Sequence, residues 1–480
     1  TFYVNEVFGS TNGPNFLMLG GESPESDAWV TNLDVAWMTY AKEVNANVFL
    51  LEHRYYGVSK PATNDLQFLT SAQMLHDVAS FIKFVKKERN STGPWITFGG
   101  SYSGALSAWA REWFPELIAG AVASSGPVEA KNDFYEYLKV VENVLTSVDA
   151  NCSARVKEAF DSMTQLSLSP AGRASLTTTF QINSGGWADD AAQPVPQENI
   201  QTFFRNIYGL ISGIVQYSGD NRKGSKITAQ DICTIMTNTT EFPDAVDAVR
   251  AVQELDAGEA VQTSALYQAR IVDLKAKLQF YAVEDHGGFT DGEFADVLWT
   301  WQTCNEFGYF QSTDYGSGIF GNAVPLNYFV EMCEQVFGIG MDRLAKGVGR
   351  NNYQYGGRAN FKGTNVVFPN GNHDPWHALG VLERGNLDAS VVPIVIEGTA
   401  HCADMYAARE SDSQQLKEAR TEILRNIKSW LGFTPAETTT VASMDSSSSA
   451  SPPPEPSTKS SSSSWTAFST VLSLLVAAVL

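Results

Sequence analysis

The sequence predicts an α/β fold in which one largely parallel sheet is interrupted by a long, mostly helical insertion. Three observations lead to this prediction. Short apolar runs alternate with amphipathic stretches over residues 1–130, as strands alternate with helices in such folds. Residues 131–362 then contain long polar, helix-like segments without convincing strands. Strand-like runs resume after residue 362, so the second part of the chain completes the sheet.

The first part of the chain supplies most of the predicted strands. Four runs are rich in β-branched and aromatic residues and apolar on both faces, which is typical of buried parallel strands. They cover residues 15–19, 48–51, 95–98 and 118–123. Residues 2–7 are also strand-like. Residues 72–89 have apolar side chains at helical spacing and basic side chains in the last turns, which favours a helix.

The second part of the chain repeats this pattern on a smaller scale. Strand-like runs at 365–369 and 392–397 are followed by an amphipathic stretch, 412–431. We therefore assign residues 1–130 and 363–433 to one sheet domain, and residues 131–362 to a mostly helical cap. No internal repeat of fixed period is visible, which argues against solenoids and propellers.

The composition limits the class of partner. The 480 residues are 43% hydrophobic, enough for a large core. A formal net charge of −20 provides no basic surface for phosphates, so we expect no nucleic-acid partner. The acidity fits either simple solubility or service in an acidic compartment, and the sequence leaves both open.

Cysteines and glycosylation sequons indicate the secretory pathway. The five cysteines are too few and too scattered for a zinc ribbon or a disulfide-dense scaffold, and two disulfides plus one free thiol is the simplest count. Asn-x-Ser/Thr sequons occur at Asn90, Asn151 and Asn238. We expect a glycoprotein that is secreted, carried on the cell surface, or lysosomal or vacuolar.

The two ends of the chain add further expectations. The sequence begins at Thr1 without an initiator Met or an apolar leader, so we expect any signal peptide to lie upstream. Residues 434–464 form a Ser/Thr/Pro-rich stalk, and residues 465–480 form an apolar run shorter than the about 20 residues of a spanning helix. This pattern is typical of a glycosylphosphatidylinositol (GPI) anchor signal, with attachment expected among residues 446–451. A weak tail anchor or a plain stalk are the alternatives.

A serine stands in the sequence context of a nucleophile elbow. The segment Gly-Gly-Ser-Tyr-Ser-Gly at residues 99–104 directly follows the predicted strand 95–98 and precedes helix-like sequence. In α/β-hydrolase folds such a strained strand-to-helix turn exposes the catalytic serine. The usual G-x-S-x-G pattern fails at its last position, where Ser103 replaces Gly. Ser101 is therefore the candidate nucleophile, in an imperfect motif.

An acid and a base follow in the order that this fold requires. A serine hydroxyl needs a base within hydrogen-bond reach, and the base needs an orienting acid. Asp374 follows the predicted strand 365–369, and His401 follows the predicted strand 392–397. Taken alone, Asp374 also fits a turn and His401 a structural histidine. Their positions at strand ends, in the order serine, acid, histidine, predict a triad of Ser101, Asp374 and His401.

The other histidines fit the role of base less well. They precede the nucleophile, lie in the insertion or adjoin the acid: His53, His76, His286, His373 and His377. His373 and His377 have the i, i+4 spacing of metal ligands, but Pro375 lies between them and no third ligand is evident. We therefore expect neither a metal nor another cofactor. Cys402 is either a reactive thiol or a small buried residue, and we favour the second.

The predicted oxyanion hole combines two backbone N–H groups. One belongs to Tyr102, directly after the nucleophile. The other comes from the loop after strand 15–19, where Gly20 and Gly21 allow the backbone to approach a ligand closely. We expect Gly21 to donate it, although an ordinary glycine turn is the alternative.

The motifs together resemble a known family of serine peptidases. This family includes the lysosomal Pro-X carboxypeptidase, the related dipeptidyl peptidases and the thymus-specific serine protease, whose branch the sequence resembles most. The shared segments extend over nearly the whole chain up to the Ser-rich tail: GGE at 20–22, EHRYYG at 52–57, GGSYSG at 99–104, SSGPV at 124–128, WQTCNEFG at 301–308, DPW at 374–376 and GTAHC at 398–402.

The resemblance implies several features of this chain. It implies an α/β-hydrolase domain with a helical cap, and the same three triad residues that the strand-end argument selects. It also implies disulfides between Cys152 and Cys233 and between Cys304 and Cys333. Trp376 matches a family position that helps to form an apolar proline pocket.

Hydrolysis of peptides next to proline is the activity that the resemblance implies. The expected enzyme is a serine-type exopeptidase, of Pro-X carboxypeptidase or dipeptidyl peptidase (aminopeptidase) type, acting on short or proline-containing peptides through an acyl-enzyme. A lipase or esterase on the same fold, or a catalytically silent cell-surface binding protein, are the alternatives. The sequence leaves open whether the chain is a monomer or a homodimer.

Overall fold

A computed structural model describes residues 1–182, 187, 194–219, 227–257, 263–283 and 286–433. The Ser-rich stalk and the apolar tail, and with them the expected lipid-anchor signal, lie outside the described residues. In the part of the chain that is described, no helix combines the length and the apolar character that crossing a membrane requires.

Seven strands of the described residues form one sheet in the order β1-β3-β2-β4-β5-β8-β9. All neighbouring pairs are parallel except the edge strand β1, which is antiparallel to β3. The strands are β1 (Phe2–Asn5), β2 (Asn15–Leu19), β3 (Asn47–Leu51), β4 (Trp95–Gly100), β5 (Gly120–Ser124), β8 (Val366–Gly371) and β9 (Val391–Ile396). Every strand predicted from the sequence is confirmed, with ends that differ by at most two residues.

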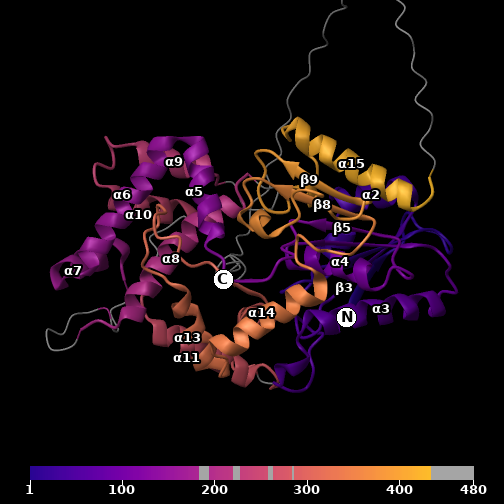
Figure 1. Ribbon diagram of the computed structural model, residues 1–480, viewed down its shortest axis with the longest axis horizontal. Coiled ribbons are helices and arrows are strands. Elements are labelled where there is room, and N and C mark those ends of the chain that lie inside the picture. Colours follow the sequence, from indigo (N-terminus) through magenta and orange to yellow (C-terminus); the bar gives the residue numbers. More distant parts are fainter. Residues whose placement is uncertain (183–186, 188–193, 220–226, 258–262, 284–285, 434–480) are drawn as a thin grey trace, which may run out of the picture.

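Helices cover both faces of this sheet, because its strands are apolar on both faces. In β2, Leu17 belongs to the core cluster that also includes residues of the two helices on one face, whereas Phe16 and Met18 belong to the cluster on the other face. The helices of the first face are α3 (Ser71–Glu88) and α4 (Tyr102–Trp113); those of the second are α2 (Ala36–Val44) and α15 (Gln414–Trp430). Figure 1 shows α15 and α2 together on one side of the strands. This arrangement is the α/β-hydrolase fold.

The segment between β5 and β8, called the cap below, is mostly helical, as predicted (Figure 1). Most of its helices lie beside the sheet rather than over its faces. They are α5 (Glu136–Val148), α6 (Ala150–Ser167), α7 (Pro170–Phe180), α8 (Gln197–Gln216), α9 (Ala229–Thr237), α10 (Ala245–Ala257), α11 (Tyr267–Phe280), α12 (Asp291–Gln302), α13 (Leu326–Phe337) and α14 (Met341–Tyr355). One apolar core cluster contains residues of the sheet, of α4 and of the cap.

The cap also contains two short strands that the sequence did not predict. β6 (Lys131–Asp133) pairs in parallel with β7 (Gly308–Phe310), joining the start of the insertion to a segment about 180 residues later. Three-residue strands lack a usable hydrophobic period, which explains why the sequence pattern missed them. The consequence for the site is that β7 carries aromatic side chains back towards the sheet.

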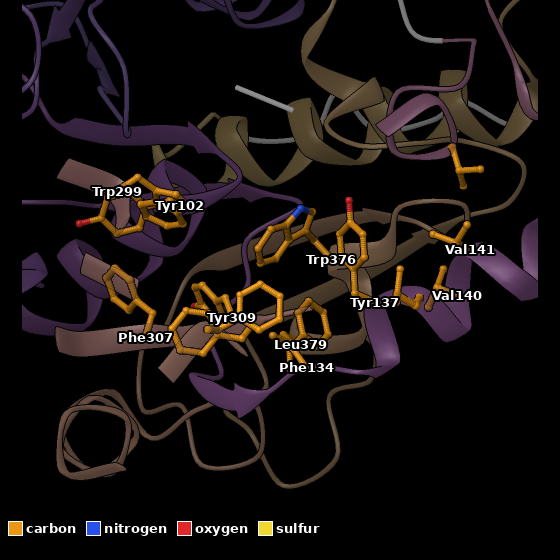
Figure 2. Close-up of a cluster of buried hydrophobic side chains, with 14 of the residues drawn as sticks. Tyr102, Phe134, Tyr137, Val140, Val141, Trp299, Phe307, Tyr309, Trp376 and Leu379 are labelled. Atoms are coloured by element: carbon orange, nitrogen blue, oxygen red, sulfur yellow. The ribbon is translucent and has the colours of Figure 1, made fainter. Parts of the chain in front are cut away.

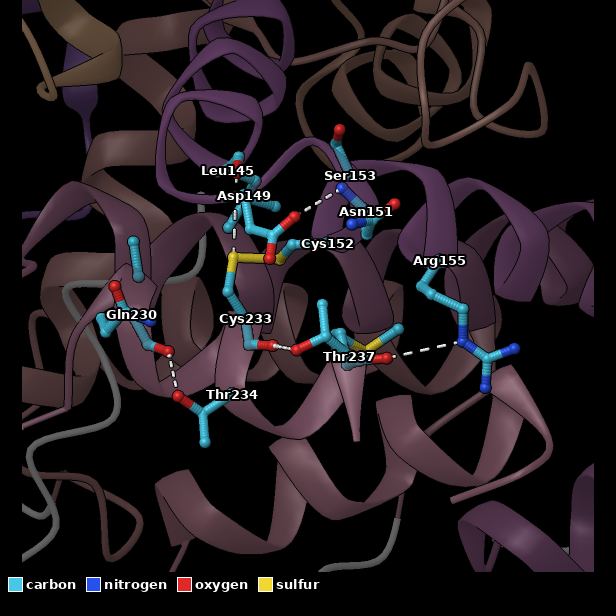
Figure 3. Close-up of a disulfide and its surroundings, with 12 residues drawn as sticks. Leu145, Asp149, Asn151, Cys152, Ser153, Arg155, Gln230, Cys233, Thr234 and Thr237 are labelled. Atoms are coloured by element: carbon cyan, nitrogen blue, oxygen red, sulfur yellow. Dashed lines mark hydrogen bonds between the residues drawn. A yellow bond between two sulfur atoms is a disulfide. The ribbon is translucent and has the colours of Figure 1, made fainter. Parts of the chain in front are cut away.

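Two disulfides stabilise the cap, as the family resemblance implies. Cys152 of α6 is bonded to Cys233 of α9 (Figure 3), and Cys304 is bonded to Cys333 of α13. Cys402 is buried and is the free cysteine of the described chain. Cys304 lies in a π-helical turn (Thr303–Phe307) between α12 and β7, so its disulfide fixes the segment that leads into β7.

Candidate active site

Ser101 lies in a strained turn between the central strand β4 and helix α4. Its φ of 60° and ψ of −132° are outside the conformations that non-glycine residues usually adopt. Hydrogen bonds fix this turn, because Ser101 N–H donates to Ser124 O at 2.9 Å and Ser101 O accepts from Ala105 N–H at 3.1 Å. The nucleophile-elbow geometry expected from the sequence is therefore present at Ser101.

The departure from the G-x-S-x-G pattern has a structural explanation. The Ser103 hydroxyl accepts from Gly100 N–H at 3.0 Å and donates to Gly100 O at 2.8 Å, bracing the residue before the nucleophile. Glycine is needed instead at the two outer positions of the segment. A Cβ on Gly99 would lie 2.0 Å from Ser103 O, and one on Gly104 would lie 2.6 Å from Ser124 O. The turn thus uses glycine where backbones touch and serine where a hydroxyl fits.

Asp374 and His401 form a buried, hydrogen-bonded pair at the ends of β8 and β9. His401 Nδ1 lies 2.8 Å from Asp374 Oδ2, and the two side chains are 3% and 0% exposed. The second carboxylate oxygen, Oδ1, accepts from Trp376 N–H at 2.9 Å. Burial opposes protonation of the imidazole, but the neighbouring Asp374 carboxylate raises the pKa of His401 well above its ordinary value. On the other side of the ring, Nε2 is buried without a hydrogen-bond partner among the described residues.

The loop that carries His401 packs against the elbow. Cys402 N–H donates to Ser125 Oγ at 2.9 Å, and Ser125 directly follows β5. A Cβ on Gly100 would lie 2.9 Å from Cys402 Sγ, so the residues next to Ser101 and His401 are in close contact. The structure thus brings the three predicted triad positions to the carboxyl ends of β4, β8 and β9, on the edge of the sheet where open α/β folds bind ligands.

The two predicted oxyanion donors lie beside the elbow. Tyr102 is the first residue of α4, so its N–H has no acceptor within the helix. A Cβ built on Gly21 would lie 3.6 Å from Ser103 Cβ, so Gly21 faces the elbow. Its N–H donates to Glu25 Oε1 at 3.3 Å, a long hydrogen bond.

A small cavity lined largely by aromatic side chains adjoins the site. Its walls include Trp376, the residue after Asp374-Pro375, together with Trp299 and Tyr309 of the cap. The Trp299 ring centroid lies 5.3 Å from that of Tyr102, and Tyr309 meets Trp376 edge-on at 5.3 Å. Figure 2 shows Trp376 between the Trp299–Tyr102 pair and Tyr137 in this cluster of buried side chains. The other lining residues are Arg205, Thr303, Phe310, Gln311, Phe329 and Met332.

Sequence reasoning identified only Trp376 of this cavity. Trp299 precedes, and Tyr309 follows, the family-like segment 301–308, which is the one sequence signal that pointed to this region.

His373 and His377, which have the spacing of metal ligands, do not form part of a metal site in the described residues. Among the residues that are described, no three His, Cys, Asp or Glu side chains gather in a way that would hold a metal ion.

Comparison with known proteins agrees with the fold and with the motifs. The model of the serine carboxypeptidase S28 family matches residues 1–423. A Caenorhabditis elegans protein named "Putative serine protease F56F10.1" is 37% identical over 90% of this chain and 81% of its own length. The human thymus-specific serine protease is 33% identical over 90% of this chain and 82% of its own.

More distant proteins extend the comparison. The mouse lysosomal Pro-X carboxypeptidase is 25% identical over 90% of this chain and 84% of its own length. Among solved structures, a proline iminopeptidase from Mycobacterium smegmatis aligns over 90% of this chain and 94% of its own with a TM-score of 0.38 and 11% identity. The family match spans the elbow and the loops of both β8 and β9. This chain belongs to the S28 family of serine carboxypeptidases and is a serine peptidase.

Proposed function

We propose that this chain is an exopeptidase that cleaves peptides next to proline, with Ser101 as nucleophile, His401 as base and Asp374 as orienting acid. The observation that carries the proposal is the buried His401–Asp374 pair, whose unpartnered Nε2 belongs to a loop packed against the strained Ser101 turn. In the neutral ring, whose Nδ1–H faces Asp374, the unpartnered Nε2 is the basic nitrogen, and the fold supplies Ser101 as its proton donor.

The proposed reaction is acyl transfer from a peptide to water. Nε2 of His401 takes the proton of Ser101 as Oγ attacks the scissile carbonyl carbon, and the carbonyl oxygen becomes an oxyanion. The N–H groups of Tyr102 and Gly21 stabilise that oxyanion. His401 then gives its proton to the leaving amine, and water attacks the acyl-enzyme by the same steps, which frees Ser101.

The aromatic cavity supports the preference for proline. Flat rings such as those of Trp299, Tyr309 and Trp376 offer apolar surface to a compact ring without requiring a hydrogen bond from it. The mouse relative is named lysosomal Pro-X carboxypeptidase, and this name indicates cleavage next to proline by that protein. The cap, which supplies most of the cavity, is expected to limit access to chain ends and short peptides.

The proposed location is the secretory pathway or the lysosome. Two disulfides favour an oxidising compartment, and Asn90 and Asn151 are exposed at their sequons. Asn238 is partly buried, and its side-chain amide donates to Glu241 at 2.9 Å. We therefore propose glycans at Asn90 and Asn151. We also propose a GPI anchor, on the basis of the sequence pattern of the tail.

Cleavage of a mixed peptide library, read by mass spectrometry, tests the proposed function. The expected products are a released carboxy-terminal residue that follows proline, or a released amino-terminal dipeptide that ends in proline. The Ser101→Ala variant is the matched control and should release neither. Cleavage at internal bonds without regard to proline, or hydrolysis of acyl esters alone, would refute the proposal.

A further inference from the structure

We propose that Gln216, the last residue of cap helix α8, is a positioning residue that couples the cap to the active site. The inference rests on the proposed function, because it concerns the same base and the same pocket. Gln216 is 8% exposed, and its backbone carbonyl accepts from His401 N–H at 2.9 Å. The cap thus holds the backbone of the proposed base directly.

The side chain of Gln216 makes a second set of contacts on the same edge. Its Oε1 accepts from the indole Nε1–H of Trp376 at 3.1 Å and from the hydroxyl of Tyr137 at 2.5 Å. An indole nitrogen only donates, and Trp376 is 8% exposed, so this acceptor determines which way the ring turns. Figure 2 shows the Trp376 nitrogen and the Tyr137 hydroxyl on the same side of the ring cluster.

Trp376 joins the pocket to the triad. Its ring lines the aromatic cavity, while its backbone N–H donates to Asp374 at 2.9 Å. Gln216 therefore acts at two points at once: its backbone carbonyl on the His401 loop and its amide oxygen on the pocket wall. Tyr217, the next residue, meets the His401 ring edge-on at 5.8 Å, so the end of α8 contacts both the backbone and the ring of His401.

The two roles predict different kinetic effects. A side-chain substitution leaves the carbonyl bond to His401 in place, so the serine should remain reactive. Loss of the amide oxygen removes the acceptor that the Trp376 indole and the Tyr137 hydroxyl share, and the Trp376 ring should lose its fixed orientation. Substrate binding in the pocket should suffer more than the chemical step.

The Gln216→Met variant provides the test, because Met has nearly the same shape but cannot replace the acceptor. For a short proline-containing peptide we expect KM to rise about tenfold and kcat to change less than threefold. The rate at which a small alkyl fluorophosphonate labels Ser101 should stay within threefold of the wild type. The control is Gln253→Met in α10, whose Oε1 accepts from Arg250 at 2.9 Å, and its KM should stay unchanged.

A double-mutant cycle separates positioning from general damage to the fold. If Gln216 acts through the Trp376 indole, Gln216→Met combined with Trp376→Phe should be no worse in KM than Trp376→Phe alone. Additive effects, a KM within twofold of the wild type for Gln216→Met, or equal losses of peptide hydrolysis and of labelling would each overturn the inference. If Gln216→Met alone does not fold, the double variant is compared with Trp376→Phe.

The wild type tests the proposed function separately. A wild type that reacts with the fluorophosphonate but cleaves no peptide would refute the proposed function and not the positioning role. In that case the inference is tested by comparing two labelling rates of Ser101. One probe is a prolyl phosphonate ester, which occupies the pocket, and the other is the small alkyl fluorophosphonate, which does not. Gln216→Met should slow the first about tenfold and leave the second unchanged, and equal rates would overturn it.

Discussion

Asp374 Oδ2 lies 2.8 Å from His401 Nδ1, in a pair that is almost completely shielded from water. The bond fixes both the tautomer and the direction of the imidazole, and it leaves Nε2 pointing away from the carboxylate. In a shielded site such a carboxylate stabilises the imidazolium that forms when the base takes a proton.

Replacing Asp374 by Asn should therefore remove most of the activity. We expect kcat/KM to fall about 10³- to 10⁴-fold, because Asn neither stabilises the imidazolium nor enforces the tautomer. The carboxylate raises the pKa of His401, so its removal should lower that pKa and move the acid limb of the pH–rate profile to lower pH. The measurement is kcat/KM against pH, and an unshifted acid limb would contradict the assignment of His401 as base.

Ser103 should contribute to the stability of the elbow. Ser103→Gly restores the common G-x-S-x-G pattern but deletes the hydroxyl that bonds to both backbone groups of Gly100. We expect the free energy of unfolding to fall by about 1–2 kcal/mol and kcat/KM to fall less than tenfold. Thermal unfolding and steady-state kinetics of Ser103→Gly and Ser103→Ala measure this. An unchanged melting temperature in both would show that the hydroxyl is dispensable.

The two disulfides should differ in their effect on function. Removing either is expected to destabilise the protein by about 2–4 kcal/mol. The Cys304–Cys333 bond adjoins Thr303, which lines the aromatic cavity, whereas Cys152–Cys233 joins α6 and α9 (Figure 3). Paired Cys→Ser variants at 304 and 333 should therefore also raise KM, while those at 152 and 233 should lower only the melting temperature. The reverse order of KM effects would be inconsistent with this cavity as the substrate site.

Lowering the pH from 8 to about 6.5 should stabilise the protein. Burial raises the pKa of Glu306 to about 7 and that of Glu25 to about 8, above the about 4.3 of an unfolded glutamate. The folded state binds more protons than the unfolded state in this range, so stability is lost as pH rises through these values. Below about 6.5 His53 opposes the trend, because burial lowers its pKa to about 4 and only the unfolded state gains its proton.

Melting temperatures measured across this pH range check the prediction. The matched variant is Glu306→Gln, which keeps an acceptor for the Ser71 N–H, 3.1 Å from Oε2, and removes the titration. Its melting temperature should vary less with pH than that of the wild type. A wild-type midpoint that climbs steadily from pH 6.5 to 8 would rule out this reading of the buried carboxyl groups.

The sequence predicted the sheet and the loops that carry Asp374 and His401 because these depend on local patterns. Buried parallel strands are continuous apolar runs, and each of the proposed triad residues directly follows such a run or its loop, as Ser101 follows β4. The hydroxyl of Ser103 was read as a departure from a motif, since only the folded turn shows that Gly100 offers both a donor and an acceptor to it.

Contacts between the cap and the sheet were beyond the reach of the sequence. Gln216 lies 185 residues before His401 in the chain, and nothing in its neighbourhood marks it as a partner of that loop. Trp299 and Tyr309 look like ordinary core aromatics until folding places them around one cavity. Such residues are defined by tertiary packing, which has no period along the chain.

Labelling of the intact protein with an alkyl fluorophosphonate, followed by peptide mapping, tests the central claim most directly. The structure predicts one adduct, on Ser101, formed quickly in the wild type and suppressed in His401→Ala, in which no base remains to take the serine proton. An adduct on another residue, or peptide hydrolysis that persists without any adduct on Ser101, would contradict the assignment of Ser101 as the nucleophile.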